Sequence, residues 1–359
     1  MTVLKQSPLP HDPLHDRPNR GFHEVLDAPL PHVFVDGCVQ VWPDADLPNA
    51  HRHGCDVYAV TALRPHGDGA SALDEMMDWH RIARENDNID LALTVRDIRA
   101  AKAAGRTTFL LASQDGEFLG ASPERVEAFQ KLGLRMLIPA YNRDNLLCGG
   151  VLEHTDAGLS ALGRHVVEEC DRVGVVLDLS HVSRRSAFDI LEASANPVVY
   201  SHANPRGVVD NARNIDDAQI KAVADKGGVI GTVNWGPLIF KKGMTARPTV
   251  HDYLDHVDYL ADLLGGTKAI GIGTDFSLGS YPPHSHDRHG PHYKTVMTEM
   301  NEYVTTYWRA PERFAEGFSS YPEIVRVAEL LKERGYGDED VAGILGENFL
   351  RVFETVWGA

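Results

Sequence analysis

Short apolar or β-branched runs recur along the chain, and each ends in polar or glycine residues before a longer segment with helical spacing. This alternation is typical of βαβ units, in which helices join parallel strands. Eight runs predict strands, at residues 32–38, 56–63, 107–113, 135–140, 174–180, 197–201, 228–233 and 269–274.

The segments between these runs place apolar residues at the intervals of an amphipathic helix. Eight strands alternating with helices favour a (β/α)8 TIM barrel. A doubly wound open sheet is the competing fold, but it does not need eight strands, and no GxGxxG motif opens a helix after the first predicted strand. Helices are predicted at 72–85, 95–105, 123–132, 160–173, 186–193, 216–226 and 250–264.

The two ends of the chain depart from the barrel pattern. Residues 1–31 are rich in proline and show no periodicity, so we expect an N-terminal arm. The last part of the chain has helical spacing at 295–308, 321–334 and 338–356. We therefore expect residues 32–359 to form a single barrel domain that includes extra C-terminal helices.

Composition narrows the class of protein. Apolar residues make up 43% of the 359 residues, which is typical of a soluble globular protein. The formal net charge of −16 disfavours nucleic acid or an anionic membrane as the partner. No apolar run approaches the roughly 18 residues of a membrane span, and the four cysteines lack CxxC spacing. We expect a cytoplasmic protein with reduced thiols.

Polar side chains follow the predicted strands, and in a TIM barrel the active site gathers at these strand ends. His181 and His202 each come one residue after a buried strand, and Asp275 follows the eighth. Neighbouring imidazoles suit a catalytic zinc ion, and a carboxylate suits a general base. If only one histidine were present, we would expect it to lie at the rim of the barrel and to form a hydrogen bond with the backbone. The alternative role of Asp275 is to cap a loop with its carboxylate. The pair favours the metal interpretation.

Six motifs in this order resemble the landmarks of the membrane (renal) dipeptidase family. The match runs from about the first strand to the last helix, and the motifs are specific only when taken together. They are Asp178-Leu179-Ser180-His181-Val182-Ser183, Tyr200-Ser201-His202, Ala212-Arg213-Asn214, Gly227-Gly228-Val229-Ile230-Gly231, Gly271-Ile272-Gly273-Thr274-Asp275-Phe276 and Gly346-Glu347-Asn348-Phe349-Leu350-Arg351-Val352-Phe353.

The resemblance implies a barrel of the metal-dependent amidohydrolase type that cleaves dipeptides with two bridged zinc ions, and a homodimer. It places His181 and His202 on the two histidines of the second metal site. It places Arg213 on the arginine that holds the substrate carboxylate, a task suited to a planar guanidinium. Asp275 falls on the aspartate that handles the proton during attack.

The first metal site departs from the family pattern. The family's Asp-Gly-His-Asn-Asp is replaced by a segment with Cys38 and Gln40, the bridging glutamate by Gln114, and the histidine after strand four by Tyr141. Losing the bridging anion and two further ligands disfavours a two-metal site. We expect a divergent member with one metal ion, zinc or another divalent metal.

The altered residues have assigned roles in this hypothesis. The Gln114 oxygen or the Cys38 thiolate could be a further metal ligand beside His181 and His202. For Cys38 we favour a role as a small buried apolar residue over a role as a ligand. The Tyr141 phenol can donate to a developing oxyanion, and its alternative is a rim residue without a role.

Three further features belong to the catalytic face. Asn234 and Trp235, past strand seven, are expected to line the substrate pocket. The loop from His284 to His292 follows the eighth predicted strand, and we expect it to act as a lid over the substrate. The alternative is a solvent-exposed loop that its prolines make stiff.

Taken together, the sequence predicts a metal-dependent hydrolase that cleaves the amide bond of a dipeptide or dipeptide-like small molecule through a metal-activated water. The alternative is an inactive or repurposed barrel that binds a carboxylated small molecule or a protein partner. A third hypothesis is a one-metal enzyme that acts on a different bond, such as that of a lactam or an ester. The sequence does not distinguish this hypothesis from the dipeptide hydrolase.

Overall fold

The computed structural model describes residues 25–279 and 313–358, and in this part of the chain eight parallel strands form the predicted barrel. Their order is β6-β5-β4-β2-β1-β9-β8-β7, and a parallel bridge between Asp178 and Val199 joins the two ends of the series. The strands are β1 (Val35–Val41), β2 (Val57–Leu63), β4 (Thr107–Ser113), β5 (Leu134–Leu137), β6 (Val176–Leu177), β7 (Val199–Tyr200), β8 (Val229–Thr232) and β9 (Ile270–Ile272).

Two short strands extend the barrel sheet without belonging to the closed series. β3 (Ile89–Leu91) pairs with β4, and β10 (Phe276–Leu278) pairs with β1. Neither was predicted from the sequence. Three residues are too few for an alternation of apolar and polar positions to stand out.

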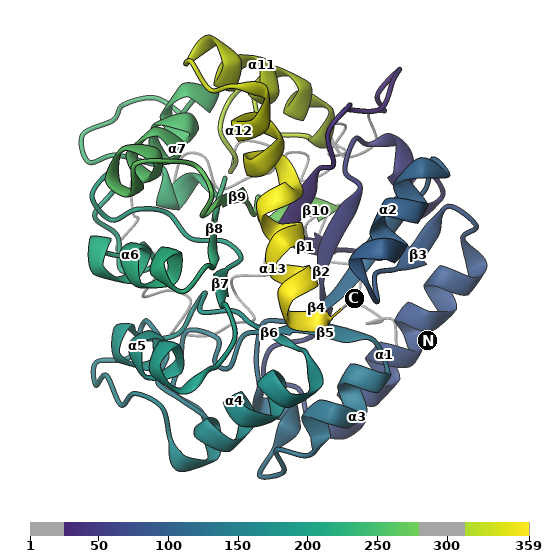
Figure 1. Ribbon diagram of the computed structural model, residues 1–359, viewed down its shortest axis with the longest axis vertical. Helices are drawn as coiled ribbons and strands as arrows, with labels where there is room; N and C mark the ends of the chain where they lie inside the picture. The colour runs from purple at the N-terminus through teal and green to yellow at the C-terminus, as the bar shows by residue number, and fades with distance from the viewer. Residues whose placement is uncertain (1–24, 280–312, 359) are drawn as a thin grey trace, which may run out of the picture.

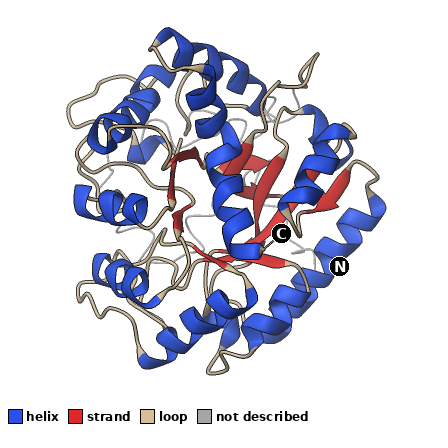
Figure 2. Cartoon of the chain, viewed as in Figure 1, coloured by secondary structure: helices blue, strands red, loops and turns tan. Residues whose placement is uncertain are grey.

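Helices surround the strands on the outside, as Figure 2 shows. Local sequence sets their ends: Thr249 forms a capping box with Asp252 before α7, and Gly265 ends that helix in the left-handed conformation. The helices are α1 (Gly69–Glu85), α2 (Val95–Ala103), α3 (Arg125–Lys131), α4 (Ala161–Val173), α5 (Arg184–Ala193), α6 (Asp217–Asp225), α7 (Val250–Leu264), α11 (Ile324–Glu333), α12 (Asp338–Ala342) and α13 (Asn348–Trp357).

The last helix, α13, lies across one end of the barrel (Figure 1). Its apolar face packs against residues at the beginnings of the strands, among them Val35, Val57 and Val176. That end of the barrel is therefore filled by side chains, and the pocket described below lies at the other end, where the strands finish.

The other predictions from the sequence have different outcomes. Eight strands alternating with helices are confirmed, and the helices predicted at 321–334 and 338–356 are present, the second divided by a π turn at Gly343–Glu347. The predicted helix at 295–308, the loop from His284 to His292 and residues 1–24 of the arm lie outside the described residues. No helix within the described ranges combines the length and apolarity that crossing a membrane requires.

Candidate active site

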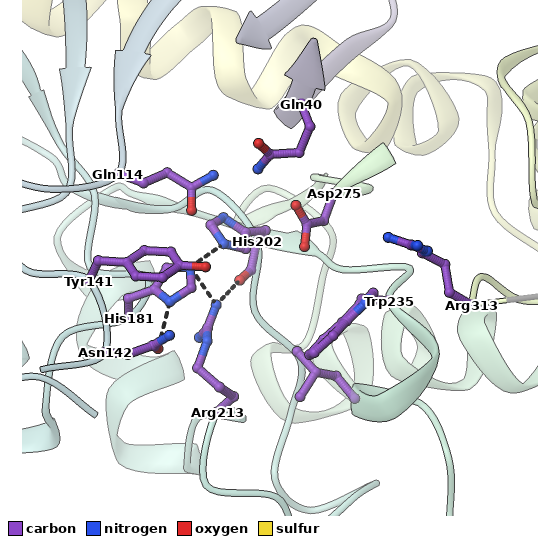
Figure 3. Close-up of a pocket in the computed structure, with 11 residues that line it drawn as sticks. Gln40, Gln114, Tyr141, Asn142, His181, His202, Arg213, Trp235, Asp275 and Arg313 are labelled. Atoms are coloured by element: carbon purple, nitrogen blue, oxygen red, sulfur yellow. Dashed lines mark hydrogen bonds between the residues drawn. The ribbon is translucent and has the colours of Figure 1, made fainter. Parts of the chain in front are cut away.

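Residues from the carboxyl ends of seven of the strands, or from the loops that follow them, meet in one pocket, where a TIM barrel builds its active site. Every predicted site residue except Cys38 and Asn234 lines this pocket, which is drawn in Figure 3. The lining residues are Gln40, Gln114, Tyr141, Asn142, His181, His202, Arg213, Trp235, Leu238, Asp275 and Arg313.

Two histidines face each other at the centre of the site. The Nε2 atoms of His181 and His202 lie 2.8 Å apart. Each ring is oriented through its other nitrogen: His181 Nδ1 lies 2.7 Å from the Asn142 amide oxygen, and His202 Nδ1 lies 2.7 Å from the Ser201 hydroxyl. Because the Asn142 oxygen only accepts, His181 carries its proton on Nδ1 and directs the lone pair of Nε2 toward His202.

A buried arginine lies against the histidine pair. The Nη2 atom of Arg213 is 3.3 Å from His181 Nε2 and 3.4 Å from the carbonyl oxygen of His202. Burial, with the added repulsion of this cation, lowers the pKa of both imidazoles well below the usual value. Both rings are therefore neutral at physiological pH and offer nitrogen lone pairs to a Lewis acid.

Buried aspartates hold the loops that carry these side chains. Asp178, after β6, accepts hydrogen bonds from the backbone N–H groups of Ser180 and Ser201 at 2.9 and 3.0 Å, which ties the ends of β6 and β7 together. Asp36 of β1 accepts from the Thr274 backbone at 2.7 Å and from the Tyr321 hydroxyl at 2.8 Å. One aspartate thus positions the two histidines, and the other positions the loop of Asp275.

The altered residues of the first metal site form a chain of hydrogen bonds that ends on Asp275. The Gln114 amide nitrogen donates to Thr61 Oγ1 at 2.7 Å and to Cys38 Sγ at 3.3 Å. The Cys38 thiol in turn donates to Asp275 Oδ1 at 3.7 Å, and Gln40 also donates to this carboxylate. Neutral donors therefore occupy the positions at which the family resemblance expects metal ligands.

The acid–base properties of this chain follow from burial. Burial raises the pKa of the Cys38 thiol well above its usual value, and the nearby carboxylate of Asp275 adds to that shift. Burial also raises the pKa of Asp275 to about 6, against the opposing effects of Gln40 and Arg213. At neutral pH, Cys38 is a thiol and Asp275 is mainly a carboxylate.

Tyr141 covers the histidine pair from one side. Its ring lies 4.2 Å, centroid to centroid, from the ring of His181 at an angle of 31°, and His66 contacts it edge-on at 6.2 Å. His66 is fixed in turn by Asp115 and Glu117, whose carboxylates lie 3.1 and 3.4 Å from its Nδ1. Sequence reasoning missed His66, because it follows a strand end by three residues and shows no motif.

The structure separates Asn234 from Trp235. Trp235 lines the pocket, whereas Asn234 is buried beside it and binds the backbone of the segment at 314–318. Its amide oxygen accepts from the Ala315 N–H at 3.1 Å, and its amide nitrogen donates to the Phe318 carbonyl oxygen. This segment brings Arg313 to the pocket, a residue that no sequence pattern singled out.

The side chains of the histidine pair are of the kind that holds a metal ion. Two neutral imidazoles converge, and a hydrogen bond on the opposite nitrogen orients each of them, as is usual for metal-bound histidine. Gln114 directs its amide nitrogen to Thr61 and Cys38, so its oxygen end faces the pair (Figure 3). Cys38 and Gln40 both donate hydrogen bonds to Asp275.

Comparison with known proteins identifies a family and several relatives. The family model of the membrane dipeptidases, peptidase family M19, matches residues 54–307. An uncharacterized dipeptidase of Schizosaccharomyces pombe is 29% identical over 240 residues, covering 66% of this chain and 50% of that protein. A dipeptidase of Claviceps purpurea is 26% identical over 273 residues, covering 76% of this chain and 56% of that protein. The match thus spans only about half the length of these curated relatives.

A solved structure agrees with the fold over most of the chain. The amidohydrolase from Pseudomonas aeruginosa superposes with a TM-score of 0.77 at 29% identity, covering 91% of this chain and 97% of that one. The likeness therefore includes the C-terminal region beyond residue 307, which the family model does not reach.

Proposed function

Since the chain belongs to the membrane dipeptidase family, we propose that it is a metal-dependent hydrolase that cleaves the amide bond of a dipeptide or dipeptide-like small molecule with one metal ion. The observation that carries the proposal is the pair of neutral imidazoles whose Nε2 atoms lie 2.8 Å apart beside a buried arginine. The two curated relatives described above are named dipeptidases, which supports the substrate class.

His181 and His202 would hold the ion, with the Gln114 oxygen as a third donor. A divalent ion held by these residues would supply a Lewis acid for the scissile carbonyl and would lower the pKa of water toward neutrality. Zinc suits two imidazole ligands, and other divalent metals bind the same donors with different affinity. Cys38, as a buried thiol bound to Asp275, is assigned a structural role in this proposal.

The residues of the chain supply the remaining steps. Arg213 binds the substrate carboxylate and orients the amide over the histidine pair. Asp275, held by Gln40 and Cys38, accepts the proton of the attacking water and passes it to the amine as the carbon–nitrogen bond breaks. Tyr141 donates a hydrogen bond to the oxygen that gains negative charge.

The test is the amount of metal per chain in protein purified without added zinc, measured by elemental analysis. We expect close to one ion, its loss in His202→Ala, and its retention in His165→Ala, an exposed histidine on α4. His202 is preferable to His181 for this purpose because His181 has a positive φ of 68°, which alanine adopts poorly. Two ions per chain would contradict the one-metal assignment.

One observation favours a second candidate function. Gln114 and Cys38, at positions where the family resemblance expects metal ligands, are hydrogen-bonded to Thr61 and Asp275, which favours a barrel that binds a carboxylated small molecule or a protein partner without catalysis. This candidate predicts no bound metal and no turnover in a dipeptide screen, with ligand binding unchanged by a chelator.

A further inference from the structure

The apolar part of the pocket wall comes from one loop. Among the described residues that line the pocket, Trp235 and Leu238 are the two apolar ones, and both lie in the loop between β8 and α7. The other lining residues are charged or carry amide, imidazole or phenol groups. The pocket therefore has one apolar side, and an apolar group of a ligand is accommodated best against it.

Trp235 keeps part of its surface open although the chain around it is buried. Residues 228–234 and 236–239 are all buried, whereas Trp235 is partly exposed. Figure 3 shows its indole ring in the pocket, near Asp275. A large aromatic side chain with an open face offers a ligand one of the strongest apolar contacts that a protein can make.

Hydrogen bonds on both sides of Trp235 hold its backbone in place. The amide oxygen of Asn234 accepts from the Ala315 N–H at 3.1 Å. The Gly236 N–H donates to the carbonyl oxygen of Arg313 at 2.6 Å. The indole is thus presented in a fixed position before a ligand arrives, so binding costs little ordering of the protein at this contact.

The apolar wall lies beside Arg213. The carbonyl oxygen of Leu238 accepts a hydrogen bond of 3.2 Å from the side-chain amide of Asn214, and Asn214 directly follows Arg213. Figure 3 shows Trp235 on the same side of the pocket as Arg213, with Tyr141 on the other side of the histidine pair. A group of the ligand that adjoins the carboxylate on Arg213 therefore meets the apolar wall.

The character of this wall decides which group it takes. The face of an indole carries partial negative charge, so it does not attract a carboxylate. An ammonium group would be drawn to that face, but the buried guanidinium of Arg213 repels a second cation beside it. An aliphatic or aromatic side chain meets neither penalty and is stabilised by the burial of its apolar surface.

We propose that Trp235 and Leu238 select ligands whose carboxyl-terminal residue has a large apolar side chain, with the carboxylate on Arg213 and the side chain on Trp235. In a dipeptide this residue joins the carboxylate to the scissile amide, so its side chain is the one closest to Arg213. For the hydrolysis proposed above, on which this assignment of the substrate rests, the substrates are dipeptides or N-acyl amino acids that end in a residue such as leucine. Trp235 is then a specificity-determining residue.

The binding arm of the test titrates N-acetylglycine and each enantiomer of N-acetylleucine calorimetrically into the full chain. The probes share one carboxylate and one amide and differ by an isobutyl group. One enantiomer of N-acetylleucine should bind about tenfold to a hundredfold more tightly than N-acetylglycine, because its side chain is buried. Trp235→Ala should reduce this preference to within about threefold, and Trp235→Phe should keep most of it. Met77→Ala, which removes an exposed apolar side chain from α1, should leave it unchanged.

A fluorescence measurement tests the same contact in a variant that keeps an aromatic ring. Binding of N-acetylleucine should change the tryptophan emission of the unmodified protein, and Trp235→Phe should remove that change while still binding the probe. Equal affinity for N-acetylleucine and N-acetylglycine, no measurable binding of either probe, or an unchanged preference in Trp235→Ala would overturn the proposal. An unchanged emission response in Trp235→Phe would also overturn it.

The hydrolysis arm compares kcat/KM of metal-loaded protein for Ala-Leu and Ala-D-Leu with that for Ala-Gly. One leucine substrate should be preferred by about tenfold or more, and Trp235→Ala should abolish that preference with little effect on Ala-Gly. Equal values of kcat/KM for all three in the unmodified protein would contradict the assignment.

The two proposals fail in different ways. Absence of hydrolysis with a retained preference for N-acetylleucine would refute the hydrolase and support the apolar site. Hydrolysis of all three dipeptides at equal rates, with the probes bound alike, would support the hydrolase and refute the apolar site. A melting temperature equal to that of the unmodified protein shows that Trp235→Ala is folded in either case.

Discussion

Strained backbone among the described residues is concentrated at the pocket. Among the described residues, four residues other than glycine have a positive φ. Asn142, His181 and Asp275 line the pocket, and His66 contacts the pocket residue Tyr141. Such conformations cost on the order of 1–3 kcal/mol each and persist where surrounding contacts impose them. The hydrogen bonds of Asp36 and Asp178 supply such contacts, so the strain supports placing the function here.

Tyr141 is the residue at which the loss of a single atom tests the mechanism. Tyr141→Phe keeps the ring that lies on His181 and removes the hydroxyl. If the phenol stabilises the developing oxyanion, kcat should fall about 100-fold with KM little changed, because the hydrogen bond strengthens only in the transition state. Steady-state kinetics on any dipeptide that is turned over measure both constants.

The companion variant Tyr141→His restores a donor at the same place. It should recover part of the lost kcat, and metal per chain should equal that of the unmodified protein in both variants. A rise in KM with kcat unchanged in Tyr141→Phe would assign the hydroxyl to substrate binding instead.

Single residues show how far the site could be predicted from the sequence. The rule that function lies at strand ends brought His181, His202 and Asp275 into one pocket correctly. Cys38 lies two positions before Gln40 on β1 and does not line the pocket, but its thiol contacts Gln114 and Asp275, which do; its role as a metal ligand stays a prediction. Arg313 was not predicted, since it follows no predicted strand directly and belongs to none of the recognised motifs.

Helices were predicted better than strands, for a physical reason. The helix at 250–264 has the predicted bounds, because capping residues mark both of its ends. β6 and β7 contain only two residues each, where runs of seven and five were predicted. The chain leaves the sheet early there because Asp178 takes up the backbone N–H groups at both strand ends.

Helix α7 carries a buried histidine that makes stability depend on pH. His256 is fully buried, and neither ring nitrogen has a hydrogen-bond partner within the described residues. Burial lowers its pKa from 6.5 to about 3, so the unfolded chain binds the proton more readily than the folded one. The associated stability is complete above about pH 6.5 and is lost as the pH falls toward 3, on the order of 5 kcal/mol in all.

His256→Leu should therefore flatten the decline in the free energy of unfolding between pH 6.5 and pH 4. At pH 7 the variant should be as stable as the unmodified protein or more stable by about 1–2 kcal/mol, since a buried polar group without a partner is removed. Urea unfolding at a series of pH values measures both effects. His165→Leu, at an exposed histidine, is the control; an undiminished decline in His256→Leu would refute the assignment.

At the scale of the whole molecule, α13 joins parts of the chain that are far apart in sequence. Phe349 projects against two strands at positions where only glycine leaves space: a Cβ on Gly271 of β9 would lie 2.5 Å from the ring, and one on Gly37 of β1 would lie 3.0 Å from it. The ring cannot move aside easily, because Phe353 stacks on it and Trp357 stacks on Phe353. The last helix thus locks the neighbouring strands β1 and β9, which are the first and the last of the barrel in the sequence.

This arrangement predicts a specific coupling between a glycine and an aromatic ring. Gly271→Ala should lower the free energy of unfolding by about 1–3 kcal/mol, because the added methyl group overpacks the contact with Phe349. Phe349→Leu alone should also destabilise, through lost burial. The double variant should be more stable than the sum of the single effects by about 1 kcal/mol, since leucine relieves the clash. Gly266→Ala, which meets nothing within 4 Å, separates this effect from the general change in backbone entropy. Strictly additive effects in denaturant unfolding would mean that α13 covers the barrel without locking it.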